Sequence, residues 1–409
     1  MARDMNTFNK EVTDKIKHNL DEFVTWLDGY GEYSYDHQSY FAGPIGGRAK
    51  RLYYSQPVLG ILAVAPMIFS EAFVPSGRKL FWKKLRFPIA DAHYAMGFAY
   101  LYQSSKIEKY YDLAVHFLSE LISSRSPGYD NYCWGYPFNW VTRNGTYPAD
   151  TPFITSTPYM YEAFASVYQI DEEQKWKDIM YSIAEHALHD IKDFPTGPDA
   201  ASCTYSPLPG ETGGVINASA YRALLLNSAY RDFNKPEYQE TARKNLNFVI
   251  SSQQENGAWY YAMDDVRDFV DHFHTCFVLK AIAKTQLMTG DDRYDECIKK
   301  GVGYYTENLF DDDHLPKPFS KPPRLTVYKR ELYDYAECLN IGVLLRGRFS
   351  SLDERIDRVL DDLLTRWRKR DGSFRARELK LGWDNVPMHR WAQAQMFRSL
   401  SFLLLKVNG

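Results

Sequence analysis

The 409-residue chain has few cysteines, and no two of them lie close together in the sequence. Without a Cys-x-x-Cys pair, neither a zinc ribbon nor a disulfide framework is expected, and such isolated thiols suit a reducing compartment. The first ten residues are polar and contain no apolar core of a signal peptide. These observations predict a cytoplasmic location. The five cysteines are Cys133, Cys203, Cys276, Cys297 and Cys338.

The chain also lacks an excess of charge of one sign and a long hydrophobic run. Lysine and arginine number 49 against 52 acidic residues, a net charge of −3, which argues against nucleic-acid binding because that affinity comes from a basic surface. The longest apolar run, residues 57–73, contains Pro66 and Glu71 and is too short for a membrane span, so no transmembrane segment is expected. The basic residues after it are interpreted as a solvated loop, with contact to a membrane surface or an anionic glycan as the alternative. They are Arg78, Lys79, Lys83, Lys84 and Arg86.

Several common enzyme motifs are absent. The sequence has no P-loop, GxGxxG, GxSxG, HExxH or EF-hand pattern. His272 and His274 lie near acidic residues and Cys276, but helical metal ligands need a spacing of three or four residues. No metal site and no cofactor are therefore predicted.

What the chain has in abundance is helical periodicity and aromatic residues. Aromatics make up 16% of the sequence, with 31 tyrosines, which fits either a large core or a site for flat polar ligands such as sugars. Apolar residues recur at helical spacing through most of the chain, and no long strand pattern competes. We predict helices over 7–27, 57–73, 90–102, 106–123, 157–169, 172–191, 217–230, 236–254, 270–288, 293–309, 331–348, 352–368 and 388–406.

These helices form two alternating sets that repeat about every 60 residues, one opening with aromatic or apolar residues and the other with polar residues. Six such hairpins bury their remaining faces by closing into a ring, so the predicted fold is all-α, an (α/α)6 toroid of the six-hairpin glycosidase-like type. An open helical solenoid is the alternative, and the long polar-aromatic connections favour the toroid. We expect helix 57–73 to begin the first pair within a single toroid domain, 57–409. Residues 1–56 would then add an extra N-terminal helix and a polar loop packed on the ring.

In a toroid of this kind the polar helix starts converge at one mouth. The inner helices are expected to begin near residues 91, 156, 217, 271, 334 and 390, so the first faces the fourth across the cavity. Asp91 and His93 would then oppose Asp271. Two opposed carboxylates can act as acid and base in glycoside hydrolysis, although each aspartate could instead cap its helix.

The densest polar cluster runs from Trp259 to Cys276. In it His272 or His274 is a candidate general acid or base, with Tyr261 as a partner, because histidine titrates near neutrality. The alternative is that both histidines are structural.

A second group of residues has the chemistry of sugar binding. Aromatic faces stack on sugar rings, and arginine binds the carboxylate of a uronate. A packed loop that plugs the mouth is the alternative for the first part of this group. The candidate substrate-binding residues are Trp134, Tyr136, Trp140, Arg143, Asn217, Trp259, Arg390 and Trp391.

Four segments together resemble the VpsJ-like proteins, which are six-hairpin toroid proteins found in bacterial polysaccharide-biosynthesis clusters. The segments are Cys133-Trp134-Gly135-Tyr136-Pro137-Phe138-Asn139-Trp140, Asn256-Gly257-Ala258-Trp259-Tyr260-Tyr261, Val270-Asp271-His272-Phe273-His274-Thr275 and Arg390-Trp391-Ala392-Gln393-Ala394-Gln395. The resemblance spans residues 130 to 405, and Cys276 stands where the family commonly has glycine. It implies the toroid fold and a glycan context, and it does not imply a mechanism.

Three functions remain open on this basis. The first is a carbohydrate-active enzyme that cleaves a glycosidic bond in a surface polysaccharide or its lipid-linked precursor, with Asp91 and Asp271 as acid and base. The second is a uronate lyase or C5-epimerase that uses His274 and Tyr261. The third is a non-catalytic glycan-binding or scaffold protein. In each case the expected partner is an oligo- or polysaccharide.

Overall fold

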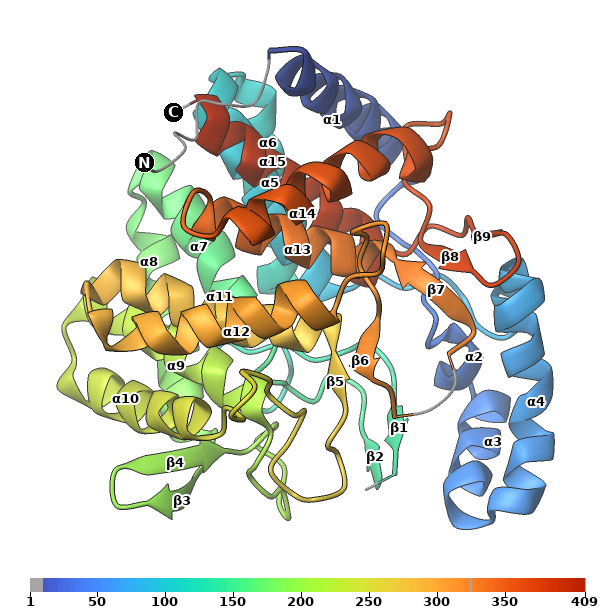
Figure 1. Cartoon of the computed structure of the whole chain (residues 1–409), viewed down its shortest axis with the longest axis horizontal. Coiled ribbons are helices and arrows are strands. Elements are labelled where there is room, and N and C mark those ends of the chain that lie inside the picture. Colours follow the sequence, from blue (N-terminus) through green and yellow to red (C-terminus); the bar gives the residue numbers. More distant parts are fainter. Residues whose placement is uncertain (1–9, 144, 324–325, 409) are drawn as a thin grey trace.

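The computed structural model describes residues 10–143, 145–323 and 326–408, and most of them lie in helices (Figure 1). Six inner helices pack side by side in chain order, and the last packs against the first, so the ring is closed. This confirms the predicted all-α (α/α)6 toroid. The inner helices are α5 (Pro88–Ser105), α7 (Thr157–Asp171), α9 (Ile216–Phe233), α11 (His272–Thr289), α13 (Leu332–Leu345) and α15 (Ala394–Asn408).

Each inner helix is paired with one outer helix. The outer helices bury a single apolar stripe against the ring, as in α14, where Leu352, Ile356 and Val359 are buried three or four residues apart. The inner helices are buried around most of their circumference. The outer helices are α6 (Glu108–Ser123), α8 (Gln174–His189), α10 (Pro236–Ser251), α12 (Asp295–Asn308), α14 (Ser350–Asp362) and α1 (Lys10–Tyr30).

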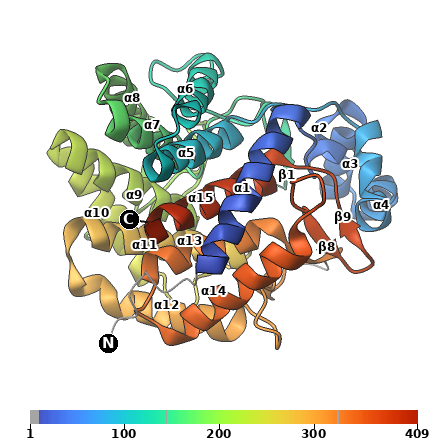
Figure 2. The same ribbon diagram turned by 90° about the horizontal axis from the view of Figure 1, so that it is seen from above.

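Helix α1 is the outer partner of α15 rather than an extra helix added to a complete ring (Figure 2). The ring of Phe23 lies 5.2 Å from that of Phe397 and 5.8 Å from that of Phe374. Residues 7–9 of the predicted helix 7–27 lie outside the described residues. The sequence pattern showed that α1 needs a partner for its apolar stripe, but the partner comes from the far end of the chain.

The prediction that helix 57–73 begins the first pair was wrong. This helix, α4 (Pro57–Phe73), packs against α3 (Pro44–Ser55) in a hairpin outside the ring (Figure 1). Among the described residues, no side chain of α3 or α4 belongs to the ring's hydrophobic core. Periodicity alone pairs successive helices along the chain and so makes helix 57–73 the first member of a pair. In the structure the first pair of the ring is α5 with α6. The division into residues 1–56 and 57–409 stays a prediction.

Short antiparallel strands lie in the connections that lead into the inner helices. Since they precede α7, α9, α11, α13 and α15, they frame the end of the ring where those helices begin. Two short helical segments, α2 (Ser39–Ala42) and η2 (Pro75–Leu80), flank the α3–α4 hairpin. The strands are β1 (Trp140–Thr142), β2 (Gly145–Tyr147), β3 (Asp193–Gly197), β4 (Ala200–Cys203), β5 (Val270–Asp271), β6 (Phe319–Lys321), β7 (Tyr328–Glu331), β8 (Arg377–Leu379) and β9 (Trp383–Asp384).

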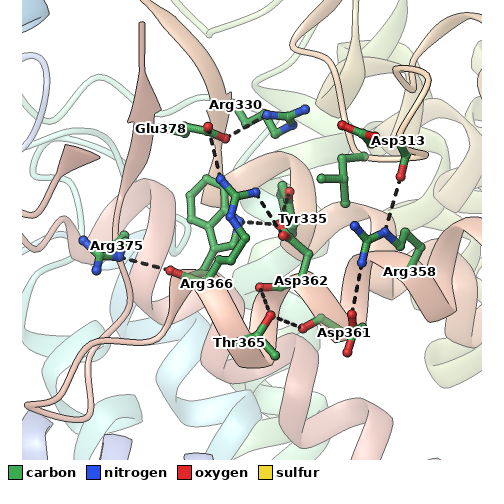
Figure 3. A network of polar contacts seen from close by, with 12 residues as sticks. Asp313, Arg330, Tyr335, Arg358, Asp361, Asp362, Thr365, Arg366, Arg375 and Glu378 are labelled. Carbon is green, nitrogen blue, oxygen red and sulfur yellow. Dashed lines mark hydrogen bonds and ion pairs between the residues drawn. The ribbon is translucent and has the colours of Figure 1, made fainter. Parts of the chain in front are cut away.

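A polar network ties the sheet β7-β8-β9 to the end of α14 (Figure 3). Glu378 accepts hydrogen bonds from Arg330 at 2.8 Å and Arg366 at 3.2 Å. Asp362 accepts from Arg366 at 3.0 Å and from the hydroxyl of Tyr335 at 2.7 Å. The network holds the loops before α13 and α15 at fixed positions on the helical frame.

The remaining irregular helical segments are short. η3 (Asp292–Tyr294) leads into α12, η4 (Leu363–Trp367) follows α14, and η5 (His389–Gln393) leads into α15.

Five buried cysteines carry free thiols. Among the described residues, no helix is both long and apolar enough to span a membrane.

Candidate active site

Two adjoining pockets lie where the inner helices begin, and both are lined by Asn217 and His274. The larger holds about 430 Å³ of empty space, part of it open to solvent, and receives at least one residue from each inner helix. The expected convergence of the helix starts is therefore observed. Its lining residues are Ile89, Tyr136, Thr155, Ser156, Tyr159, Tyr205, Asn217, His274, Phe277, Tyr333, Arg390, Trp391 and Gln395.

The smaller pocket, of about 230 Å³, is built around the start of α11. Asp271 ends strand β5 and caps α11, where its Oδ1 accepts the backbone N–H of His274 at 2.9 Å. Its Oδ2 lies 2.6 Å from Nδ1 of the His274 ring. A carboxylate at Nδ1 keeps the proton of the neutral imidazole on that nitrogen, so Nε2 carries the free lone pair. The Asp271–His274 pair is thus an oriented base, and its histidine lines both pockets.

Tyr261 stands beside this pair, with its ring centroid 4.8 Å from that of His274. Burial raises the pKa of Tyr261 to about 12, against the opposing charge of Arg267. The hydroxyl therefore keeps its proton at neutral pH and can act as a proton donor. His274 and Tyr261 together supply one acceptor and one donor at the same pocket wall.

Asn217, at the first turn of α9, is 2% exposed. Neither polar atom of its amide has a hydrogen-bond partner among the described residues. Nε1 of Trp391 and Oε1 of Gln395, which line the larger pocket, are likewise buried and unpartnered. An unpaired buried polar group costs about 1–3 kcal/mol. Three such groups around one pocket make it suited to a polar ligand.

Arg390 forms a rigid wall of the larger pocket. Its Nε and Nη2 donate to the two carboxylate oxygens of Asp36 at 3.0 and 2.5 Å. Burial pushes the pKa of Asp36 up, but the charge of Arg390 outweighs it and holds this pKa well below its usual range. The guanidinium also lies 4.5 Å from the ring centroid of Tyr136 and 4.6 Å from that of Trp391. The charge of Arg390 is thus balanced by Asp36, and the aromatic faces held around it suit a ligand that carries a ring.

Beneath the pocket, the interior of the ring holds a buried ionic cluster. Nζ of Lys280 donates to Glu337 at 2.5 Å and to the hydroxyl of Tyr159 at 2.8 Å, and Arg398 donates to Glu337 at 3.3 Å. Burial lowers the pKa of Lys280 to about 8. Tyr159 connects this cluster to the larger pocket, because it belongs to both.

Two of the predicted catalytic residues do not face the pockets. Asp91 is bonded through Oδ2 to Nε of Arg86 at 2.9 Å, and Arg86 also pairs with Glu32 and Glu120, so this carboxylate points toward α1 and α6. The expected opposition of Asp91 and Asp271 across the cavity was wrong. Residues two apart on a helix lie about 200° apart around its axis, and Ile89, two residues earlier, is the residue that lines the pocket.

His272 is also turned away from the pockets, because it lies two residues from His274, which lines them. Its Nδ1 contacts the carbonyl oxygens of Leu309 and Lys317 at 3.1 and 3.2 Å, and its Nε2 lies 2.7 Å from the hydroxyl of Tyr305. Burial lowers its pKa to about 3. His272 therefore pins the loop after α12, and its predicted acid-base role does not fit this position.

Four of the predicted binding residues are outside the larger pocket. Trp134 is a core residue whose indole donates to the carbonyl of Leu121 at 2.7 Å, a correction to its predicted role. Trp259 donates to Val249 at 2.9 Å and reaches only the smaller pocket. Trp140 packs with Phe153 and Tyr205 behind the pocket wall. Arg143 is exposed at the turn between β1 and β2, away from the lining residues.

The structure thus brings Asp271, His274, Tyr261, Asn217, Arg390, Trp391 and Tyr136 together and adds residues that the sequence analysis did not select. Of these, Gln395 follows Trp391 by four residues, a spacing that places both on one helical face. Tyr159 and Tyr333 stand at the first turns of α7 and α13, so position in the inner helices was a signal for them. Tyr205 lies in a loop without such a pattern. Among the described residues, no cluster of histidine, cysteine and acidic side chains has the geometry of a metal site.

The fold is shared with several solved structures. The cellobiose 2-epimerase of Bacillus thermoamylovorans is similar over 78% of this chain and 87% of its own, with 11% identity and a TM-score of 0.61. A family 76 glycoside hydrolase from a bovine Bacteroides thetaiotaomicron strain is similar over 79% of this chain and 69% of its own, with 11% identity and a TM-score of 0.58. A polysaccharide lyase is similar over 83% and 95%, with 12% identity and a TM-score of 0.52.

The closed ring and these similarities define the class: the chain has the fold of the six-hairpin glycosidase-like (α/α)6 proteins. No protein-family profile and no curated protein sequence matches it.

Proposed function

We propose that the protein is a carbohydrate-active enzyme that moves a proton at a carbon of its sugar substrate, as a lyase or an epimerase. The observation that carries this proposal is the Asp271–His274 pair beside Tyr261 at the pocket. Histidine oriented by a carboxylate is a base suited to neutral pH. A carbohydrate substrate is supported by the similar structures, which are a cellobiose 2-epimerase, a glycoside hydrolase and a polysaccharide lyase.

In the common first step, Nε2 of His274 takes the proton from the carbon next to the carboxylate or carbonyl of the sugar. In elimination, the electrons of that C–H bond form a C=C bond, the C–O bond to the next sugar breaks, and Tyr261 gives its proton to the leaving oxygen. In epimerisation, a donor on the opposite face returns a proton to the same carbon. A uronate fits either route, because the buried amide of Asn217, which has no partner among the described residues, can donate a hydrogen bond to its carboxylate.

Cleavage by two carboxylates is supported less well. Both the inverting and the retaining mechanism need two carboxyl groups that flank the bond. Among the described residues that line the two pockets, Asp271 is the one carboxylate, and it already holds His274. The resemblance to VpsJ-like proteins adds a context of surface-polysaccharide biosynthesis, with a lipid-linked or uronate-containing glycan and a cytoplasmic location, as part of the proposal.

The test is solvent exchange. The protein is incubated in heavy water with neutral and uronate oligosaccharides, and deuterium at the sugar carbons is followed by NMR and mass spectrometry. We expect deuterium at the carbon beside the carboxylate or carbonyl, or an unsaturated product, with wild-type protein. His274→Gln should abolish the reaction. His189→Gln, at an exposed histidine at the end of α8, is the matched control and should retain it.

Two results would overturn the proposal. Release of saturated sugars without exchange would assign the pocket to hydrolysis. A thermal shift with a glycan, but no exchange and no product with any glycan class, would assign it to binding alone.

A further inference from the structure

The α3–α4 hairpin exposes an unusual amount of apolar surface. Of the 17 residues of α4, only Gly60, Val64 and Met67 are buried, and Gly60 lies against α3. A helix that is apolar on nearly all sides needs cover on nearly all sides. The exposed large side chains of the hairpin are Ile45, Tyr53, Tyr54, Val58, Leu59, Ile61, Leu62, Ile68, Phe69 and Phe73, and their exposed fractions reach 78% at Val58 and 69% at Leu62.

The hairpin is a built element rather than a loose segment. A Cβ atom added to Gly60 would lie 2.1 Å from Cα of Tyr53, so the two helices touch backbone to backbone. Arg377 pairs with Glu71 at 2.7 Å and ties the end of α4 to β8. In Figure 1 the hairpin stands out from the ring at its edge.

The segment that carries this surface has an excess of exposed positive charge. Residues 37–90 contain eight lysines and arginines and one acidic residue, Glu71, and two of these cations, Arg78 and Arg86, pair with acids from other segments. Because Glu71 is paired with Arg377, it neutralises none of the hairpin's own cations. The exposed cations are Arg48, Arg51, Lys79 and Lys83.

We propose that the α3–α4 hairpin docks on an anionic lipid membrane, with the apolar face of α4 in the interface and the cations on lipid phosphates. Apolar side chains bordered by lysine and arginine, with tyrosines between them, have the composition of interfacial helices. Anionic lipids attract clustered cations. A second copy of the chain would set the same cations against each other, and like charges across an interface oppose association.

The hairpin also lies on the side of the ring where the pocket opens. Helices α2 and α3 both pack on β1, and Trp140 of β1 packs on Tyr205, which lines the larger pocket. Docking would bring the mouth near the lipid headgroups, where a glycan carried on a lipid is within reach. The membrane contact itself does not depend on the proposed reaction.

The test is co-sedimentation of the full chain with two kinds of vesicle, phosphatidylcholine alone and phosphatidylcholine with phosphatidylglycerol in equal parts. We expect binding to the anionic vesicles, weakened by salt, and much less to the neutral ones. Leu62→Glu/Phe69→Glu should lower the partition coefficient at least about tenfold, since each change removes a large apolar group from the interface. Leu287→Glu/Leu381→Glu, at equally exposed sites outside the hairpin, is the matched control and should bind as wild type.

Sedimentation velocity without lipid completes the test. Vesicle binding that the hairpin variant leaves unchanged would overturn the proposal. So would a protein that fails to bind anionic vesicles at low salt, whether it is a monomer or a dimer that Leu62→Glu/Phe69→Glu dissociates. The dimer would assign the surface to a second copy. Neither outcome bears on the exchange reaction at His274, so the two proposals can fail separately.

Discussion

Asp271 holds His274 at two points, through the backbone N–H at 2.9 Å and through ring Nδ1 at 2.6 Å. One carboxylate therefore both caps α11 and sets the orientation of the histidine. An asparagine at this position can still accept the backbone N–H through its carbonyl oxygen. Its NH2 group would face Nδ1, which favours the opposite tautomer and removes the lone pair from Nε2.

We therefore expect Asp271→Asn to lower kcat about 10²- to 10⁴-fold, the range of a lost general base. The cap is retained, so the thermal midpoint should change little. Steady-state rates on the glycan identified by solvent exchange, together with circular dichroism melts, measure both quantities. An unfolded variant, or one with full activity, would contradict the assignment.

Asp91→Asn should have the opposite effect to Asp271→Asn: activity is kept, and the dependence of stability on pH changes. Burial raises the pKa of Asp91 to about 7, although the charge of Arg86 works against this. The folded state then holds a proton that the unfolded state releases above about pH 3.9, so this group's stabilising contribution is lost as pH rises through about 7. The variant should keep its activity, and its stability should rise more steeply with pH than that of wild type between about pH 4 and pH 7, because the opposing contribution of Asp91 is gone. Activity as low as that of Asp271→Asn would restore the two-carboxylate mechanism.

Asn217→Leu should separate binding from stability. The buried amide has no partner among the described residues, so replacing it with an apolar group of similar size removes a cost of about 1–3 kcal/mol. We expect a higher thermal midpoint without ligand and a smaller ligand-induced shift with it. Asn227→Leu, on the same helix but outside both pockets, is the comparison. A variant that is less stable and binds glycan normally would show that the amide is structural.

Two buried histidines predict sensitivity to acid. Burial lowers the pKa of His272 to about 3 and that of His389 to about 4. The unfolded state takes up these protons near pH 6.5 and the folded state does not, so stability present above that pH is lost as pH falls. Each group contributes at most about 1.4 kcal/mol per pH unit. Burial also raises the pKa of Asp91 and Asp334, which opposes this effect, and lowers the pKa of His37 and His93, which adds to it. The histidines outnumber the two aspartates, so the net slope keeps the sign set by the histidines.

Urea unfolding between about pH 4 and pH 7 measures this slope. His272→Gln should reduce it, whereas the exposed control His189→Gln should leave it unchanged. Equal slopes for the wild type and His272→Gln would contradict the neutral state of this histidine.

Glu337→Gln should destabilise the ring strongly. It leaves Lys280 and Arg398 buried without their shared counter-ion, and breaking a buried pair in this way costs about 3–5 kcal/mol. Glu296→Gln, on the exposed face of α12, is the control. Urea unfolding of the two variants at neutral pH gives the comparison, and a small loss in Glu337→Gln would mean that Lys280 gives up its proton instead.

The alternation of helices was predictable from the sequence, and the identity of one outer partner was not. Periodicity shows which side chains of α1 must be buried, but it carries no information on what buries them. The apolar stripe of α1, which contains Phe23, packs on α15. This contact joins the two ends of the ring, and no local sequence pattern encodes it. The exposed apolar helix α4 has the same periodicity as a ring helix and was assigned to the ring for that reason.

The site was predictable to the level of segments. Polar residues at the inner helix starts did mark the pocket, but the faces of those helices were not resolved. Asp91 and His272 each lie two residues from the side chain that lines a pocket, Ile89 and His274 respectively, and a two-residue step reverses the direction of a helical side chain. The partners that turn them away, Arg86 and Tyr305, belong to other parts of the fold.

The pairing of α1 with α15 has a consequence for biosynthesis. Helix α1 leaves the ribosome before any other described helix, yet its apolar stripe is covered only after residues 394–408 have followed. Closure of the ring is then a contact of very high sequence separation, the kind that forms slowly and late. Until it forms, Ile16, Leu20 and Phe23 remain open to chaperones and to neighbouring nascent chains.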